Sequence, residues 1–111
     1  WIAAWNAHDL DRIMAHYSEE IEFASPFIVK LTGQSDGTLH GKGALRDYFE
    51  RGLRAYPQLH FELIRLYAGV HSCVVEYRSV QGLRAAEVME FNERGEIRRV
   101  LAHYTDDAVT S

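Results

Sequence analysis

The second half of the chain consists of four segments in which apolar and polar side chains alternate, each separated from the next by a short turn. The turns contain Gly69, Gly82 and Gly95. Alternation with a period of two is typical of strands with one buried face, and turns this short join antiparallel neighbours. This half therefore predicts an antiparallel sheet in which consecutive strands lie side by side. The predicted strands are 59–67, 70–79, 83–92 and 97–104.

Helical periodicity is confined to the first half of the chain. Trp1 and Trp5 share one face of a short helical segment, which is interrupted at residues 6–9. Asp9 is a suitable N-cap for a second helix, because apolar side chains follow it at i, i+3, i+4 and i+7 as far as Tyr17. We therefore expect two short helices before the first strand.

The segment between these helices and the strands is mixed. A short alternating stretch over 21–25 predicts a strand that Pro26 closes, and the glycine-rich stretch 32–43 predicts a mobile loop. An amphipathic helix follows Gly43 and ends before Pro57. Because the helices come first and the strands last, the sequence predicts an α+β fold in which the helices lie on one face of a curved sheet.

Composition limits the class of protein. The 111 residues predict a single domain over 1–111, and 47% of them are apolar. Twelve basic and sixteen acidic side chains give a net charge of −4, which argues against a nucleic-acid partner. No apolar run is long enough to span a membrane. Since Cys73 is the only cysteine, we expect a reduced, cytoplasmic protein, and since the chain opens on Trp1, we expect the natural chain to start earlier.

Glu87 is the strongest candidate for a chemical role. It lies at the centre of a strand face that is otherwise apolar. Burial there would raise the pKa of the carboxyl, as a general acid, a general base or an oxyanion-binding acid requires. The alternatives are that Glu87 forms an ion pair with a residue such as Arg65, or that this strand face is more exposed to solvent than the pattern indicates. The residues that share this face with Glu87 are Leu83, Ala85, Met89 and Phe91.

Small side chains alternate with aromatic ones on the same side of neighbouring strands. This mixture leaves room for an apolar ligand pocket, although a filled core fits the pattern equally well. The side chains concerned are Cys73, Val75, Tyr77, Ala85, Val100, Ala102 and Tyr104.

Other chemistries find no support in the sequence. The six histidines show neither HExxH nor His-x-His spacing, so we expect no metal site. The serines lack the glycines of a nucleophile elbow, and the glycines of 33–43 do not have the spacing of a phosphate loop. Cys73 lies within a predicted strand and is expected to be inert.

Five stretches together resemble the nuclear transport factor 2-like superfamily, in particular its SnoaL-like and ketosteroid isomerase-like members. The stretches are WNAHDLDRIMAHYSEEIEF (5–23), ASPF (24–27), HGKGALRDYF (40–49), VMEFNERGEI (88–97) and AHY (102–104). The resemblance implies a cone-shaped, curved antiparallel sheet wrapped around the N-terminal helices and enclosing an apolar pocket. Members include isomerases, polyketide cyclases, dehydratases and non-catalytic binding modules, so the fold alone does not fix the activity.

The resemblance also places the ketosteroid isomerase site on this chain. The general-base aspartate falls on Ser25, which cannot accept a proton and return it near neutral pH, so the ordinary ketosteroid isomerase mechanism loses its base. The oxyanion-hole tyrosine falls on Trp1 and the protonated aspartate beside it on Glu87. The supporting tyrosine falls on Tyr17. For the acid or base of SnoaL-like cyclases, the nearest candidates are His103, which alternation points out of the pocket, and Asp106.

We therefore expect a pocket protein that acts by acid–base chemistry on an apolar, carbonyl-containing, polyketide- or steroid-like molecule, without a cofactor or a metal. The alternative is a ligand-binding or dimerisation module without turnover. The candidate catalytic residues are Glu87, Tyr17 and Tyr104. The candidate ligand-binding residues are Trp1, Trp5, Ser25, Phe27, Phe49, Cys73, Val75, Tyr77, Ala85, Met89, Val100 and Ala102.

The outer face of the predicted sheet mixes apolar and charged side chains. Such a surface suits a self-complementary two-fold interface, so we expect a homodimer. The side chains assigned to this face are Ile64, Arg84, Ala86, Val88, Glu90, Ile97, Arg99, Leu101 and His103.

Overall fold

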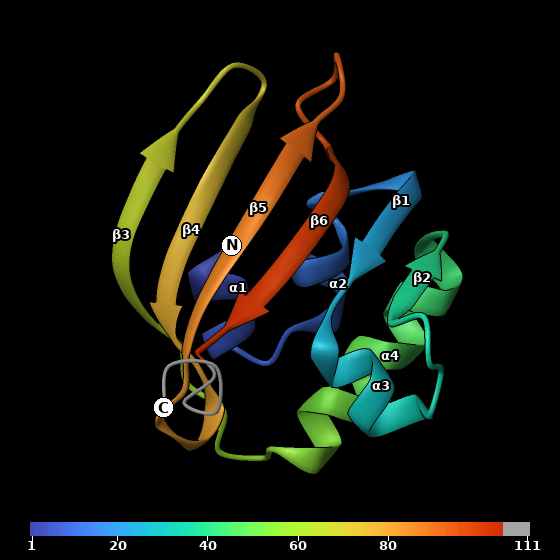
Figure 1. The fold of residues 1–111 in the computed structure, drawn as a ribbon, viewed down its shortest axis with the longest axis vertical. Helices are drawn as coiled ribbons and strands as arrows, with labels where there is room; N and C mark the ends of the chain where they lie inside the picture. The colour runs from blue at the N-terminus through green and yellow to red at the C-terminus, as the bar shows by residue number, and fades with distance from the viewer. Residues whose placement is uncertain (106–111) are drawn as a thin grey trace.

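The computed structural model describes residues 1–105, which form one six-stranded sheet with four α-helices on one of its faces and at one of its edges (Figure 1). The helices are α1 (Ile2–Asn6), α2 (Leu10–Met14), α3 (Pro26–Thr32) and α4 (Lys42–Ala55). The strands are β1 (Tyr17–Ala24), β2 (Thr38–His40), β3 (Glu62–Ala68), β4 (Ser72–Arg78), β5 (Arg84–Phe91) and β6 (Ile97–Tyr104). A 3₁₀ turn, η1 (Val80–Gly82), joins β4 to β5. No helix in this part of the chain is long and apolar enough to cross a membrane.

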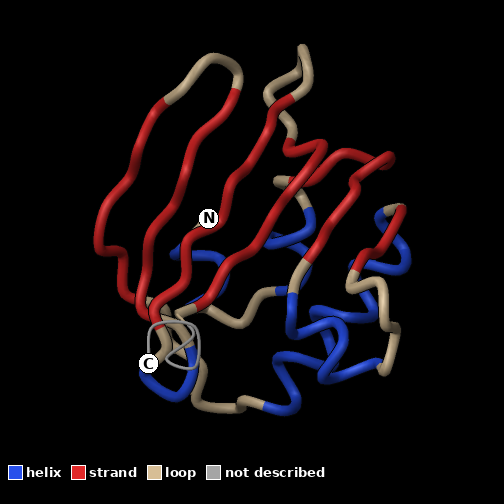
Figure 2. Tube along the Cα trace, in the orientation of Figure 1, coloured by secondary structure: helices blue, strands red, loops and turns tan. Residues whose placement is uncertain are grey.

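The strand order is β2-β1-β6-β5-β4-β3. Strands β3 to β6 form the predicted antiparallel meander. The sheet is nevertheless mixed, because β1 runs parallel to β6. A parallel pair needs a long connection, and the whole chain from α3 to β5 separates these two strands. Figure 2 shows the meander on one side of the sheet, with the helices behind and beside it.

The first strand begins earlier than the sequence pattern predicts. The second helix ends at Met14 and not at Tyr17, and β1 starts at Tyr17. Tyr17 and Ser18 are both buried there, and Tyr17 pairs with Ile97 of β6. Pairing with the last strand of the chain overrides the local helical spacing that extends to Tyr17.

Two short elements, α3 and β2, were not predicted from the sequence. Ser25 caps α3 by accepting a hydrogen bond from the backbone N–H of Phe27 at 3.2 Å, and Pro26 occupies the first turn. Gly33 ends the helix at φ 77°, a conformation that glycine adopts readily. Strand β2 lies within the predicted loop 32–43.

The core lies between the helices and the sheet face that they cover, which we call the inner face. Alternate residues of β5 are buried on this face, as the period of two predicts. Ile97 is also on the inner face and is 4% exposed, so its assignment to the outer face was wrong. The cause is a bulge, since Phe91 pairs with Ile97 while Glu90 pairs with Arg99.

Candidate active site

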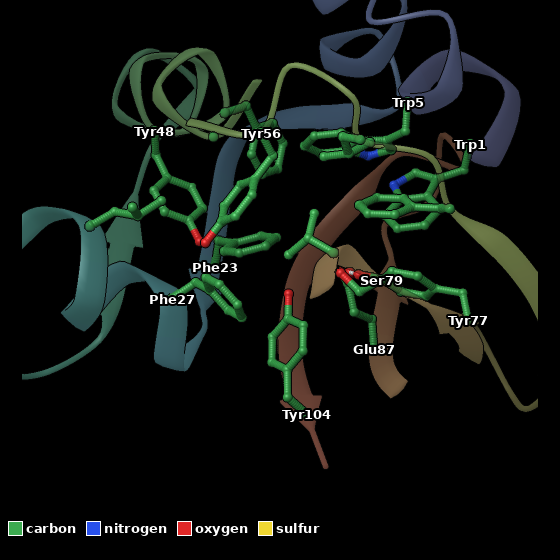
Figure 3. Close-up of a pocket in the computed structure, with 16 residues that line it drawn as sticks. Trp1, Trp5, Phe23, Phe27, Tyr48, Tyr56, Tyr77, Ser79, Glu87 and Tyr104 are labelled. Carbon is green, nitrogen blue, oxygen red and sulfur yellow. Dashed lines mark hydrogen bonds between the residues drawn. The ribbon is translucent and has the colours of Figure 1, made fainter. Parts of the chain in front are cut away.

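An aromatic cavity of about 60 Å³ lies between the inner face and helices α1, α3 and α4 (Figure 3). Among the described residues that line it, Glu87 alone has a side chain that can carry a charge at neutral pH. Seven of the residues predicted from the sequence line it: Trp1, Trp5, Phe27, Phe49, Tyr77, Glu87 and Tyr104.

The Glu87 carboxyl is buried at the middle of β5, and its side chain enters the cavity from the sheet. The hydroxyl of Tyr77, on the neighbouring strand β4, donates a hydrogen bond to Oε2. The other oxygen, Oε1, is buried and has no hydrogen-bond partner. Arg65 is exposed and forms no ion pair with Glu87, so the structure does not support the predicted alternative of a neutralising arginine.

Burial controls the protonation of Glu87. Removing the carboxylate from water raises its pKa from 4.5 to about 7, and the hydrogen bond from Tyr77 opposes this shift. Near neutral pH the protein therefore contains both the neutral acid and the carboxylate. A group with this property can give and take a proton during one reaction.

Three further phenols line the cavity, those of Tyr48, Tyr56 and Tyr104. Tyr104 enters from β6 with its hydroxyl directed towards the cavity, and Tyr48 enters from α4 (Figure 3). Burial is the main cause that raises the pKa of both side chains, and the nearby charge of Glu87 raises it further. Both remain protonated near neutral pH and can donate a hydrogen bond to a bound molecule.

Tyr17 lies behind the cavity wall. Its side chain is fully buried, and its hydroxyl accepts a hydrogen bond from Trp1 Nε1 at 2.9 Å. Tyr17 is not part of the lining, whereas the Trp1 ring is. Tyr17 therefore supports the position of Trp1.

Ser25 has a structural task in place of the general base that the resemblance assigned to this position. Its hydroxyl caps α3 and is not part of the cavity lining. The cap places the first turn of α3, which carries Phe27 into the wall.

Three predicted ligand-binding residues lie in a different hollow of about 420 Å³, and Trp1 lies between this hollow and the main cavity. These residues are Cys73, Val75 and Met89. Ala85, Val100 and Ala102 are buried in the sheet and line neither space.

The lining also contains residues that the sequence analysis did not propose as site residues. The apolar stripe of α4 has the same sequence pattern as a helix that packs in a filled core, and the turn from α4 to β3 contains no recognisable motif. A signal was nevertheless present, because aromatic side chains recur from Tyr48 to Phe61. The residues concerned are Phe23, Leu31, Tyr48, Gly52, Tyr56, Leu59, Phe61, Ser79 and Val80.

A pair of side chains holds α1 against this lining. The Asn6 amide donates to the Phe61 carbonyl oxygen at 2.9 Å and accepts from the Phe61 N–H at 2.6 Å. His8 Nε2 lies 2.7 Å from the Leu59 carbonyl oxygen. These contacts fix Trp1 and the rest of α1 over the start of β3.

The remaining candidates do not enter the cavity. His103 is exposed, with its ring on the outer face as alternation predicts, and Asp106 lies outside the described residues. Within residues 1–105, no group of three or more His, Cys, Asp or Glu side chains could hold a metal ion.

Comparison with known proteins identifies close structural relatives. A family model described as a SnoaL-like domain matches residues 1–100. A crystal structure of a SnoaL-like protein of unknown function from Burkholderia thailandensis is 44% identical, with a TM-score of 0.92, over 96% of this chain and 88% of that one. No curated protein matches the chain.

More distant structures share the fold. A proposed isomerase of the SnoaL-like family from Agrobacterium tumefaciens is 16% identical, with a TM-score of 0.75, over 95% of this chain and 91% of that one. A proposed ketosteroid isomerase from Kribbella flavida is 17% identical, with a TM-score of 0.73, over 95% of this chain and 72% of that one.

Proposed function

The chain belongs to the SnoaL-like family, and we propose that it is a cofactor-independent enzyme of the isomerase, cyclase or dehydratase type. Its substrate would be an apolar molecule with a carbonyl group. The observation that carries this proposal is Glu87, a buried carboxyl with one unpartnered oxygen in an aromatic cavity.

In the proposed reaction, a single carboxyl performs both proton transfers. Neutral Glu87 delivers its proton to the carbonyl oxygen of the substrate, and the carboxylate so formed removes a proton from the adjacent carbon. The product is an enol, and Glu87 is neutral again. Tyr104 donates a hydrogen bond to the same substrate oxygen. This scheme needs no base at the position of Ser25.

The size of the cavity bears on the substrate. Ligand pockets usually have volumes of roughly 300–1,000 Å³, and this cavity has about 60 Å³. A polyketide- or steroid-like substrate would therefore enter only if part of the wall moved. A single reactive ring requires the smallest movement.

The direct test is exchange of substrate hydrogen for deuterium. We expect the protein to accelerate exchange at the carbon next to the carbonyl of small cyclic ketones, measured by proton NMR in D₂O. Glu87→Gln should lower this rate by about 100-fold or more, as general acid–base catalysis contributes that much. Glu90→Gln, on the same strand but in ion pairs with Arg98 and Arg99, is the matched control. Equal rates for wild type and Glu87→Gln would refute the proposal.

The second candidate function is ligand binding or dimerisation without turnover. Ser25 favours it, because the helix cap occupies the position of the isomerase base. In that case Glu87→Gln would alter affinity alone, and no substrate would exchange.

We also propose that the protein is a cytoplasmic homodimer that pairs through the outer face of the sheet. Half-buried apolar side chains at the centre of this face, including Val88 and Leu101, support the interface. Ion pairs such as Arg84–Glu76 at 2.5 Å surround them. The cytoplasmic location rests on the single cysteine, Cys73.

A further inference from the structure

We propose that Tyr77 is a positioning residue that keeps the proton of neutral Glu87 on Oε1, so that the cavity selects uncharged molecules presenting a hydrogen-bond acceptor. This inference deepens the proposed function and rests on it for the identity of the site. It can nevertheless be tested by binding alone, without any turnover.

The hydrogen bond between Tyr77 and Glu87 indicates which carboxyl oxygen holds the proton. The Tyr77 hydroxyl donates to Glu87 Oε2, so this oxygen acts as an acceptor. A carboxylic acid has one proton, and a proton on Oε2 would compete with the tyrosine for the same site. The proton of neutral Glu87 therefore belongs on Oε1.

The environment of Oε1 favours a ligand that presents a hydrogen-bond acceptor. This oxygen is buried and has no partner in the protein, while the carboxyl enters the cavity. A buried donor without a partner is unfavourable, and a ligand that supplies an acceptor removes this cost. An apolar ligand of the same shape gains only the binding free energy of burying its apolar surface.

The groups around the Glu87 carboxyl are neutral, which favours an uncharged ligand. The titratable groups that interact electrostatically with Glu87 are phenols and a thiol, and their pKa values are raised, so all are neutral near pH 7. Because the described lining contains no cationic side chain, an anionic ligand would lose its hydration without gaining a side-chain counter-charge. These groups are Tyr77 and Cys73 on β4, Tyr104 on β6, Tyr17 on β1 and Tyr48 on α4.

Three single-ring probes of nearly equal size separate these effects. Acetophenone presents a carbonyl acceptor, α-methylstyrene replaces the carbonyl oxygen with a CH₂ group, and benzoate is an anion. Binding is followed through the indole N–H signals of Trp1 and Trp5 in ¹H–¹⁵N NMR spectra, since both rings line the cavity. At about pH 6 we expect acetophenone to bind about tenfold more tightly than α-methylstyrene, the value of one typical hydrogen bond. Benzoate should bind at least tenfold more weakly than acetophenone.

The pH dependence tests the proton on Oε1. The preference for acetophenone should fall as the pH rises from about 6 to about 8.5, because ionised Glu87 has no proton to donate and only the hydrogen bond from Tyr104 remains. In Glu87→Gln, Tyr77 should hold the amide oxygen and leave the NH₂ group facing the cavity. This variant should keep the preference at every pH.

Tyr77→Phe tests the positioning role. Loss of the hydrogen bond should shift the pH midpoint of acetophenone binding upwards, since that bond stabilises the carboxylate. The preference for the acceptor should also shrink about twofold or more, because either oxygen can then carry the proton. Tyr67→Phe, at a half-exposed tyrosine of β3 outside the cavity, is the matched control and should change neither value.

Two results would overturn the inference. One is equal affinity for acetophenone and α-methylstyrene at pH 6. The other is an unchanged pH midpoint in Tyr77→Phe. If the expected binding pattern appears but no substrate exchanges hydrogen, the inference stands and the enzymatic proposal fails.

Discussion

Trp1 and Tyr17, which the family resemblance assigns to the hydrogen-bonding network of the pocket, bond to each other. The indole Nε1 donates to the Tyr17 hydroxyl at 2.9 Å. The Trp1 ring also stacks on Phe61 and meets the edge of Tyr77, with ring centroids 6.0 and 5.3 Å apart. The hydroxyl of Tyr17 thus anchors an aromatic wall of the cavity from behind.

Removing this anchor should affect stability more than chemistry. In Tyr17→Phe the Trp1 N–H loses its partner, which should lower the free energy of unfolding by about 1 kcal/mol. The rate of hydrogen exchange on a ketone substrate should fall less than tenfold, because the Glu87 carboxyl is untouched. Urea denaturation and exchange kinetics give the two values. A loss of rate as large as that of Glu87→Gln would show that Tyr17 acts directly on the substrate.

The protonation of Glu87 should make the folded state less stable as the pH rises. The folded protein has a Glu87 pKa of about 7 against an ordinary value of 4.5, so it binds more protons than the unfolded chain between these values. The stability contributed by this group is full below about pH 4.5 and is lost as the pH rises through 7. The pKa difference corresponds to about 3 kcal/mol.

Urea denaturation of wild type and Glu87→Gln between about pH 5 and 8.5 measures this effect. The wild type should lose about 2.5 kcal/mol relative to the variant over this range, since part of the full difference falls below about pH 5. Other titrating groups are common to both proteins and cancel in the comparison. Parallel curves for the two proteins would mean that Glu87 has an ordinary pKa.

Local patterns were sufficient to predict the part of the fold that consists of consecutive strands. The alternation in 83–92 placed Glu87 on the buried face, and 97–104 is the exact extent of β6. Tyr17 was misplaced because its helical spacing is a local feature, whereas its pairing with Ile97 spans most of the chain. Ile97 was misplaced because a bulge shifts the alternation of β6, and no residue pattern marks that bulge.

The candidate site was predicted in part for the same reason. Side chains that enter the cavity from strand alternation, such as Tyr77, Glu87 and Tyr104, were identified. Of those from α4 and the turn after it, only Phe49 was identified, because a helical apolar stripe looks the same whether it meets a sheet or a cavity. Ser25 carried the signal for a helix cap, with Pro26 directly after it, but the family resemblance assigned this position to a catalytic base.

The two hydrogen bonds between the Asn6 side chain and the Phe61 backbone should be important for the stability of the fold. Asn6→Ala leaves the N–H and C=O groups of the buried residue Phe61 without partners, which should lower the free energy of unfolding by about 2–3 kcal/mol. Asn6→Asp keeps the acceptor for the Phe61 N–H and loses only the donor, so its loss should be smaller. Thermal and urea denaturation measure both. Equal stability of Asn6→Ala and wild type would contradict this role.

The outer face of the sheet should mediate dimerisation. Val88 lies at its centre beside Leu101, with which it pairs across β5 and β6. A lysine at this position would place two unpaired charges, one from each subunit, in the two-fold interface, where desolvation is costly. We expect wild type to have twice the monomer mass in light scattering at roughly tens of micromolar, and Val88→Lys to have the monomer mass. Val29→Lys, at an exposed position of α3, is the matched control and should remain dimeric. A monomeric wild type at these concentrations would refute the proposed interface, and a dimeric Val88→Lys would place it elsewhere on the molecule.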